Sequence, residues 1–236
     1  MVEYEDERDP YERIAAEIRA QIMSGVRAPG DVLPSNPALA DEFGASGTTV
    51  QKALAALKRE GWIEGRAGLN RSVRTRQIRE ITAGAYFDPT KTGVVYDILD
   101  VREVEPAGDV ATALKGERAI LRHRLMKDSK GLLEADWSYY PASLAVGSPL
   151  ALPRKIRGGA PRALANMGFP ERKFVDVVSA RAATDYEARL LELPRDVPVL
   201  RILRTMFSDD DRVVGVTVLV KATHLLAQRY VQFVAD

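Results

Sequence analysis

The sequence has 236 residues but no cysteine and only two histidines. Without cysteine there is no disulfide framework and no thiolate metal site, so packing must supply the stability. His123 and His224 have no partners at metal-ligand spacing, and we predict that each is packed or faces solvent. No apolar run approaches the length of a membrane span, and the acidic start is unlike a signal peptide. We therefore expect a cytoplasmic protein that makes no membrane contact.

Motifs of catalysis are absent as well. No glycine-rich phosphate loop stands between a strand and a helix, and no Ser/His/Asp arrangement is apparent. The three acids Asp209, Asp210 and Asp211 stand between two strand-like runs, where a solvated turn is the commoner meaning than a cation site. We predict no catalytic residue, no cofactor and no metal.

The net charge of +1 averages regions of opposite sign. Residues 1–12 contain six acidic residues and one basic residue, whereas residues 47–79 contain eight basic and two acidic residues. A local basic excess indicates a polyanion as the partner of that segment, although a solvated charged face would give the same composition. The length allows one large domain or two ordinary domains.

Three helices and a hairpin are predicted in residues 1–75. Helical periodicity and capping residues place the helices at about 9–25, 35–44 and 46–61, with a sharp turn at "APGDVLPS". The run "WIEGRAGLNRSVRT" then predicts two short strands around a tip that contains glycine and arginine. Together these elements predict a winged helix-turn-helix.

The third helix has a polar first turn that its packing does not require. Its apolar stripe begins at Val50, and the residues around it are short or hydrogen-bonding. In a helix-turn-helix this end of the helix faces base edges in the major groove, while wing arginines contact the backbone or the minor groove. The alternative for the serine and threonines is helix capping alone. The predicted DNA contacts are Ser35, Asn36, Ser46, Gly47, Thr48, Thr49, Gln51 and Lys52, with Arg66, Gly68 and Arg71 on the wing.

Residues 11–75 resemble the winged helix-turn-helix of the GntR family of bacterial transcription regulators. The matching residues include Pro29-Gly30, Leu33-Pro34-Ser35, Phe43-Gly44, Thr48-Thr49-Val50 and the wing glycine Gly68. The resemblance implies binding to double-stranded operator DNA. Three positions depart from the family's usual residues, where this chain has Asn36-Pro37, Gly47 and Gln51-Lys52 in place of Glu-Arg or arginine. We expect a different operator, since each lost Arg–guanine pair removes about 1–3 kcal/mol of discrimination.

Beyond a polar, turn-rich segment at 76–92, which we interpret as a linker, the pattern becomes mixed. Strands are predicted at about 93–106, on both sides of Asp128–Gly131, and at 174–183, 198–207, 213–223 and 229–235. Helices are predicted at 107–116, 160–168 and 184–193, the last with a capping box at Thr184 and Glu187. Strands joined by short turns with interspersed helices predict an antiparallel α+β domain over residues 93–236.

This second half is similar to the UTRA ligand-sensing domain of the HutC subfamily of GntR regulators. The residues that carry the similarity are Val104–Pro106, Arg124, "WSYYPA" and "ARAATDYEARLLELPRDVPVLRILR". The resemblance implies a fold like that of chorismate lyase, a small-molecule effector between its elements and a homodimer that releases DNA when the effector binds.

Family pockets commonly pair an Arg-x-Arg with an acid on the next strand and a late Glu-Tyr. Aligned without gaps, these positions fall on the predicted effector residues Arg124, Met126, Asp136, Tyr139, Gly215 and Val216. Arginine binds phosphate and carboxylate bidentately, so the loss of one arginine and of the late acid predicts a less anionic, more apolar effector than a sugar phosphate. The alternative is that Arg124 and Asp136 form a structural pair across the hairpin.

The residues and the resemblance together predict a transcriptional repressor that responds to a small effector. Two alternatives stay open. One is an effector-independent repressor whose second domain only dimerises, and the other is a lyase-like enzyme tethered to DNA.

Overall fold

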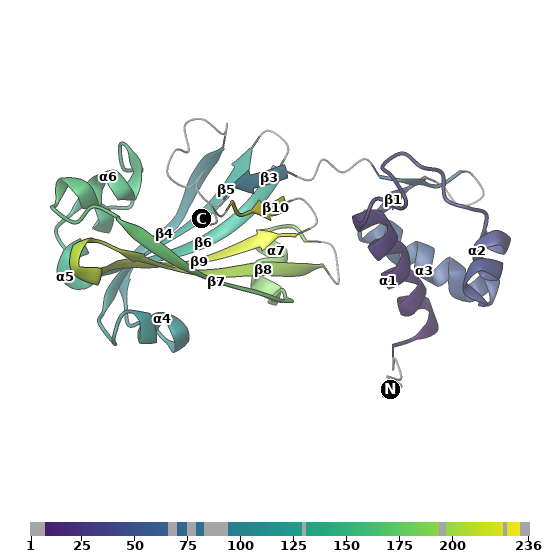
Figure 1. The fold of residues 1–236 in the computed structure, drawn as a ribbon, viewed down its shortest axis with the longest axis horizontal. Helices are drawn as coiled ribbons and strands as arrows, with labels where there is room; N and C mark the ends of the chain where they lie inside the picture. Colours follow the sequence, from purple (N-terminus) through teal and green to yellow (C-terminus); the bar gives the residue numbers. More distant parts are fainter. Residues whose placement is uncertain are drawn as a thin grey trace, which may run out of the picture. The chain divides into compact units, whose positions relative to one another are not determined.

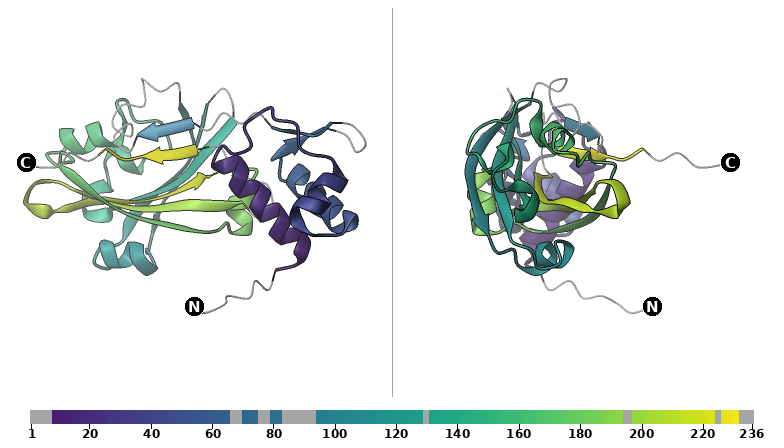
Figure 2. Two further views of the ribbon diagram at one scale, coloured as in Figure 1. Left: turned by 45° about the vertical axis from the view of Figure 1, so that its right-hand side comes forward. Right: turned by 90° about the vertical axis from the view of Figure 1, so that its left-hand side faces the viewer.

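A computed structural model describes residues 8–65, 70–74, 79–82, 94–128, 131–193, 197–223 and 226–231. The chain forms two compact units, one of Met1–Gln77 and the other of Ile78–Leu193 with Val197–Asp236. Figure 1 and Figure 2 show the elements of each unit.

The first unit contains the three predicted helices. They are α1 (Pro10–Met23), α2 (Asn36–Phe43) and α3 (Gly47–Arg59). The Ser35 hydroxyl accepts a hydrogen bond from the Ala38 amide at the start of α2, and Gly44 ends that helix in the left-handed conformation with a φ of 57°. Both devices are sequence-encoded, because serine is a preferred N-cap and glycine tolerates a positive φ.

One apolar cluster holds the three helices together. The cluster includes Ile14, Ile18, Leu39, Val50, Leu54, Leu57 and Trp62. At its border the Arg19 guanidinium donates from Nε and Nη2 to the Glu60 carboxylate, at 2.7 and 3.1 Å. Since Glu60 is 2% exposed, this pair fixes α1 against the end of α3.

The predicted hairpin is present after α3. Strands β1 (Ile63–Glu64) and β2 (Ser72–Val73) pair in antiparallel fashion, and Val32 forms a further bridge to Ser72. The winged helix-turn-helix prediction is therefore confirmed, although residues 66–69 at the tip lie outside the described residues.

The second unit is built on an antiparallel six-stranded sheet with the order β4-β5-β6-β9-β8-β7 (Figure 1). The strands are β4 (Val95–Val104), β5 (Ala119–Asp128), β6 (Gly131–Pro141), β7 (Lys173–Ala182), β8 (Pro198–Phe207) and β9 (Val213–Ala222). Each of them overlaps a strand predicted from the sequence. The antiparallel α+β prediction is confirmed.

Helices cover both faces of this sheet. One face, here called the α4 face, packs against α4 (Gly108–Ala113) through Val110 and carries α7 (Asp185–Leu190). The other, here called the α6 face, packs against α5 (Ala142–Ala145), the 3-10 turn η3 (Pro149–Ala151) and α6 (Gly159–Asn166). The sequence did not predict α5 or η3, because three or four residues are too few to show a helical period.

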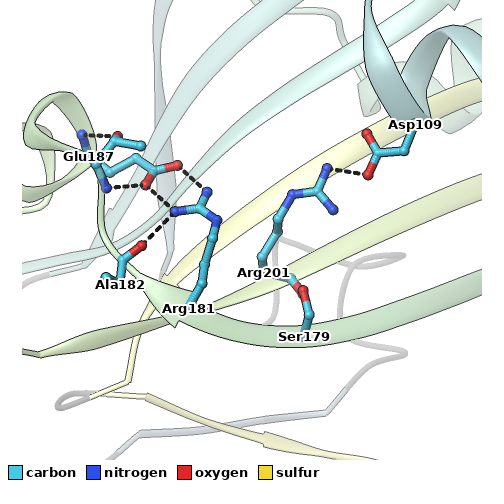
Figure 3. Close-up of polar contacts among 7 residues, drawn as sticks. Asp109, Ser179, Arg181, Ala182, Glu187 and Arg201 are labelled. Carbon is cyan, nitrogen blue, oxygen red and sulfur yellow. Dashed lines mark hydrogen bonds and ion pairs between the residues drawn. The ribbon is translucent and has the colours of Figure 1, made fainter.

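Ion pairs tie the two helices of the α4 face to the sheet (Figure 3). Arg181 of β7 donates two hydrogen bonds to the Glu187 carboxylate of α7, at 2.7 and 2.6 Å. Arg201 of β8 pairs with Asp109 of α4 at 2.7 Å. Glu187 also closes the predicted capping box by accepting from the Thr184 amide at 2.8 Å.

The linker prediction needs a correction. Within 76–92, residues Arg79–Thr82 form strand β3, which pairs in parallel with β10 (Leu226–Arg229). The sequence could not show this pairing, because the two strands are four residues long and far apart in the chain. Strand β10 ends at Arg229, so the strand predicted at 229–235 shares only that residue with it. Tyr230 and Val231 are in no strand, and residues 232–236 lie outside the described residues.

Candidate DNA-binding surface and effector site

The first turns of α3 present polar side chains to solvent. Thr48, Gln51 and Lys52 are exposed, whereas Val50 on the same turns is fully buried. Gly47 is also exposed, and a Cβ built on it would meet nothing within 4 Å. Hydroxyl, amide and ammonium groups on such a face suit base edges and phosphates.

The Ser46 side chain caps the start of α3. The Ser46 hydroxyl accepts from the Thr49 amide at 3.2 Å and lies 2.8 Å from the Thr49 hydroxyl. The capping interpretation therefore holds for Ser46, with Thr49 as its bonding partner, while Thr48 has no part in these bonds.

A hydrogen bond joins α2 to the wing. The Arg71 guanidinium donates from Nη1 to the Asn36 side-chain oxygen at 2.6 Å. The backbone of Arg71 also accepts from the Leu33 amide at 2.7 Å, which fixes the strand beside the start of α2. Two predicted DNA contacts are thus neighbours in space. Arg66 and Gly68 lie outside the described residues.

On the α6 face of the second unit, polar residues lie in one row across the sheet. Strand pairing aligns Arg122 with Ser138, Ser138 with Thr217, Thr217 with Arg204, and Arg204 with Asp176. The first four side chains are at most 3% exposed. We call these five residues the polar row.

Arg124 and Asp136 lie beside the polar row on the same face. The Arg124 Nε donates to Asp136 Oδ1 at 2.9 Å, and its Nη2 donates to the Ser138 hydroxyl at 3.2 Å. Thr217 extends this network by donating to the Ser138 oxygen at 3.0 Å. Burial raises the pKa of Asp136 to about 6, against the opposing effect of the Arg124 charge. The predicted pairing across the hairpin is present, and it belongs to a larger network.

Two further ion pairs lie in this part of the sheet. Arg204 donates to both oxygens of Asp176 at 2.7 Å and lies 3.9 Å from the centre of the Phe174 ring. Lys221 pairs with Glu134, and both side chains are at most 5% exposed. Glu171 has a pKa raised to about 7 because burial outweighs the field of Arg204.

Arg122 is an arginine that the gapless alignment left out. It precedes Arg124 by two residues on β5, so the alternation of a strand puts both on the α6 face. Its guanidinium donates to the carbonyl oxygens of Leu150, Leu152 and Arg154, at 2.7–2.8 Å. An Arg-x-Arg pair is therefore present after all, and one of its members holds the η3 segment.

The remaining predicted effector residues do not all join Arg124. Tyr139 and Val216 pack on the α4 face with Val110, and Tyr140, one residue on, lies on the α6 face. A Cβ on Gly215 would come within 2.6 Å of Met206 and 3.2 Å of Tyr140, so this glycine makes room for the tyrosine ring. Met126 is in an apolar cluster with Leu133 and Leu226. The residues that sequence reasoning missed are Arg122, Ser138, Tyr140, Glu171, Asp176 and Thr217.

The sequence contains a signal that could have identified Arg122 and Ser138. Arg122-x-Arg124 and Asp136-x-Ser138 each repeat at the period of a strand. Their partners on β7 and β9 could not be found in this way, because the register between distant strands is a property of the folded sheet.

His123 lies on the opposite face to its neighbours Arg122 and Arg124. Its ring stacks on Trp137 with a centroid distance of 4.3 Å, and its Nε2 lies 3.0 Å from the Tyr186 hydroxyl of α7. Burial lowers the pKa of His123. The described residues include no cluster of three or more potential metal ligands and no helix long and apolar enough to cross a membrane.

This architecture, a winged helix-turn-helix and an antiparallel α+β unit with a buried polar network, is that of a ligand-sensing transcription regulator. Residues 10–69 match the gntR family of bacterial regulatory proteins, and residues 93–224 match the UTRA domain. The chain belongs to the GntR family of transcriptional regulators, with the HutC-like combination of a GntR head and a UTRA domain. Regulators of this family bind DNA, and UTRA domains bind small-molecule effectors.

Individual relatives agree with this assignment. An uncharacterised HTH-type transcriptional regulator of Streptomyces coelicolor is 26% identical, over 93% of this chain and 91% of its own. The mannosyl-D-glycerate transport/metabolism system repressor MngR of Escherichia coli is 40% identical over 68 residues, or 29% of this chain and 28% of its own. A crystal structure assigned to the GntR-family regulators superposes with a TM-score of 0.67 at 23% identity, covering 97% and 99% of the two chains, which shows the fold.

Proposed function

We propose that this regulator is a homodimeric repressor that leaves its operator when a small effector binds the UTRA domain. The observation that carries DNA reading is the exposed polar end of α3, since Thr48, Gln51 and Lys52 project from a helix whose other side is buried. The proposed domains are residues 1–75 for DNA binding and 93–236 for effector binding and dimerisation, with residues 76–92, which include strand β3, between them. The proposed compartment is the cytoplasm.

Binding-site selection from random DNA tests this proposal. Two copies with paired UTRA domains would place their recognition helices about one helical turn apart, so the selected sites should contain two inverted half-sites. The departures at Asn36, Gly47 and Gln51 should give half-sites unlike the family's usual guanine-containing ones. A selection that enriches no sequence would contradict operator recognition.

Release by the effector follows from linkage. If the effector favours a dimer that is mis-spaced for the operator, operator DNA must weaken effector binding by the same factor. Titrating a stabilising compound with and without operator measures this factor. An effector that binds both forms equally would refute the mechanism and leave the effector-independent repressor as the better account.

We further propose that the UTRA unit catalyses nothing. The chain's similarity to a transcriptional regulator over 93% of its length supports a sensing role rather than a catalytic one. Incubation of the purified protein with a compound that binds it should return the compound unchanged, and turnover would favour the lyase-like alternative.

The buried polar network on the α6 face bears on the predicted charge of the effector. The site is polar rather than apolar, yet its arginines are engaged with acids and carbonyl groups of the same unit. We therefore propose an effector that is less anionic than a sugar phosphate, because these arginines are paired. The polar side chains on this face do not support the more apolar character that Met126 suggested.

A further inference from the structure

Strand β7 forms one edge of the six-stranded sheet, and β4 forms the other (Figure 1). β7 pairs with β8 over ten consecutive residues without a bulge, and no strand among the described residues lies on its outer side. An edge strand of this kind presents backbone N–H and C=O groups that a further strand can pair with.

Apolar side chains gather on the β7 edge. Val175, Val177 and Val178 are 49%, 59% and 45% exposed. Register with β8 puts Val175 and Val177 on the α4 face and Val178 on the α6 face. Tyr230 is also exposed on the α6 face, where its hydroxyl donates to Asp176 of β7 at 3.4 Å. A strand added beside β7 would therefore bury apolar surface on both faces of the sheet.

The opposite edge has the features that prevent such pairing. A bulge interrupts the register of β4 between Ile98 and Asp100. Four charged side chains of this strand are at least 41% exposed, namely those of Asp97, Asp100, Arg102 and Glu103. Bulges and exposed charges are the usual means by which proteins block edge-to-edge association, and β7 has no bulge and no charge between Val177 and Ala180.

The charged side chains of β7 are neutralised within their own unit. They form the ion pairs Lys173–Asp211, Asp176–Arg204 and Arg181–Glu187. Two copies of this strand can therefore meet without bringing unpaired like charges together. A second copy of the same chain thus fits this edge in charge as well as in apolar character.

We propose, building on the homodimer of the function proposed above, that two copies of this chain associate through β7. The two β7 strands run antiparallel about a two-fold axis perpendicular to the sheet, so that the two six-stranded sheets become one continuous sheet. Valines of one copy then lie opposite apolar or small residues of the other, as in other stable cross-strand pairs. The two-fold axis also supplies the two DNA-binding units that inverted half-sites require.

Sedimentation analysis of the full chain tests the surface. The wild type should be a dimer, and Val177→Lys should raise the dimer dissociation constant at least about tenfold, because the substitution brings two like charges to the contact. Leu99→Lys on β4, where the side chain is 43% exposed, is the matched control and should remain as dimeric as the wild type. Circular dichroism should show that both variants are folded.

Three results would overturn the assignment. They are a monomeric wild type, which would leave the edge to a different protein, a Val177→Lys variant as dimeric as the wild type, and a Leu99→Lys variant that alone dissociates.

The absence of cysteine from the sequence allows a second test that does not depend on dissociation. Nitroxide labels on Val177→Cys of two copies should lie within about 25 Å of each other. Labels on Leu99→Cys should be more than about 40 Å apart, because five strand spacings of about 4.8 Å separate β4 from β7 in each copy. Pulsed electron paramagnetic resonance measures both distances, and a shorter distance for Leu99→Cys would contradict association through β7.

DNA binding by the same samples separates this proposal from the function proposed above. A dimer joined through β7 that ignores every DNA offered refutes the proposed function and leaves the interface standing. A wild type that binds selected operator DNA as a dimer joined elsewhere refutes the β7 interface alone.

Discussion

In the first unit, the polar side chains assigned to function lie on the surface of one helix, whereas in the second they are buried across a sheet. Thr48 and Gln51 are exposed and can contact a partner from solution. Arg204 and Asp136 are at most 3% exposed and are bonded to other parts of the same unit. The difference matches two kinds of partner, because a duplex approaches from outside while a small molecule can be enclosed.

This difference in burial also predicts different effects of mutation in the two units. Removing an exposed polar group should change binding and leave folding intact. Removing one member of a buried pair should change folding first, because the other member keeps its charge in a poorly solvating environment.

Asp176→Ala should lower the free energy of unfolding of the second unit by about 3–5 kcal/mol, since it leaves Arg204 buried without its bidentate partner. Denaturant titration measures the loss. Asp209→Ala removes an ion pair whose side chains are 61% exposed, and it should change the same quantity by at most about 1 kcal/mol. Equal effects of the two substitutions would contradict the buried character of the Arg204 pair.

Thr48→Ala and Gln51→Ala should each weaken operator binding by about 1–3 kcal/mol while affecting random DNA much less. Fluorescence polarisation measures the affinity of each variant for both DNAs and so gives the ratio of the two losses. Thr112→Ala, on the exposed side of α4, makes the same threonine substitution away from the DNA-binding unit and should leave both affinities unchanged. Equal losses on the two DNAs would remove the residue from the base-reading set.

Arg71→Ala should weaken binding to operator and random DNA alike, because a phosphate contact carries no sequence information. The slope of log affinity against log salt should become shallower by about 0.9. Asn36→Ala keeps the arginine but removes its 2.6 Å hydrogen bond, so a smaller loss in affinity is expected. Arg189→Ala on α7 is the charge-matched control, and a salt slope as shallow as that of Arg71→Ala would show that net charge alone explains the result.

Glu171→Gln should reduce the dependence of stability on pH. The pKa of Glu171 is raised to about 7 from its ordinary 4.5 by burial, so its contribution is present below pH 4.5 and is lost as the pH rises through 7. Between pH 6 and 8 the wild type should therefore lose about 1 kcal/mol that the variant keeps. Unfolding curves of both proteins at the two pH values measure the difference, and parallel behaviour would place the Glu171 carboxyl in water.

The elements of the first unit could be read from the sequence because their signals are local. Ser35, Gly44 and Ser46 mark helix ends within a few residues of the turns they cap, and the structure places them there. The bond between Arg71 and Asn36 was beyond such reasoning, since 35 residues separate the two.

In the second unit the sequence predicted strands but not their partners. Arg124 and Asp136 face each other across a hairpin, which sequence alone can align. The polar row reaches Asp176 of β7 through β9 and β8, which come later in the chain than β7. Only the sheet order β6-β9-β8-β7 brings the residues of these four strands together. Tyr139 lies on the opposite face of the sheet from Asp136, because residues three apart in a strand point to opposite sides.

Control of the DNA-binding unit by the second unit is tested by measuring how the full chain binds its selected operator before and after addition of the compound that stabilises it most. We expect tight, sequence-dependent binding that weakens as the compound is added, with operator DNA weakening the compound's binding by the same factor. Operator binding that the compound leaves unchanged would contradict a regulator whose second unit controls its first.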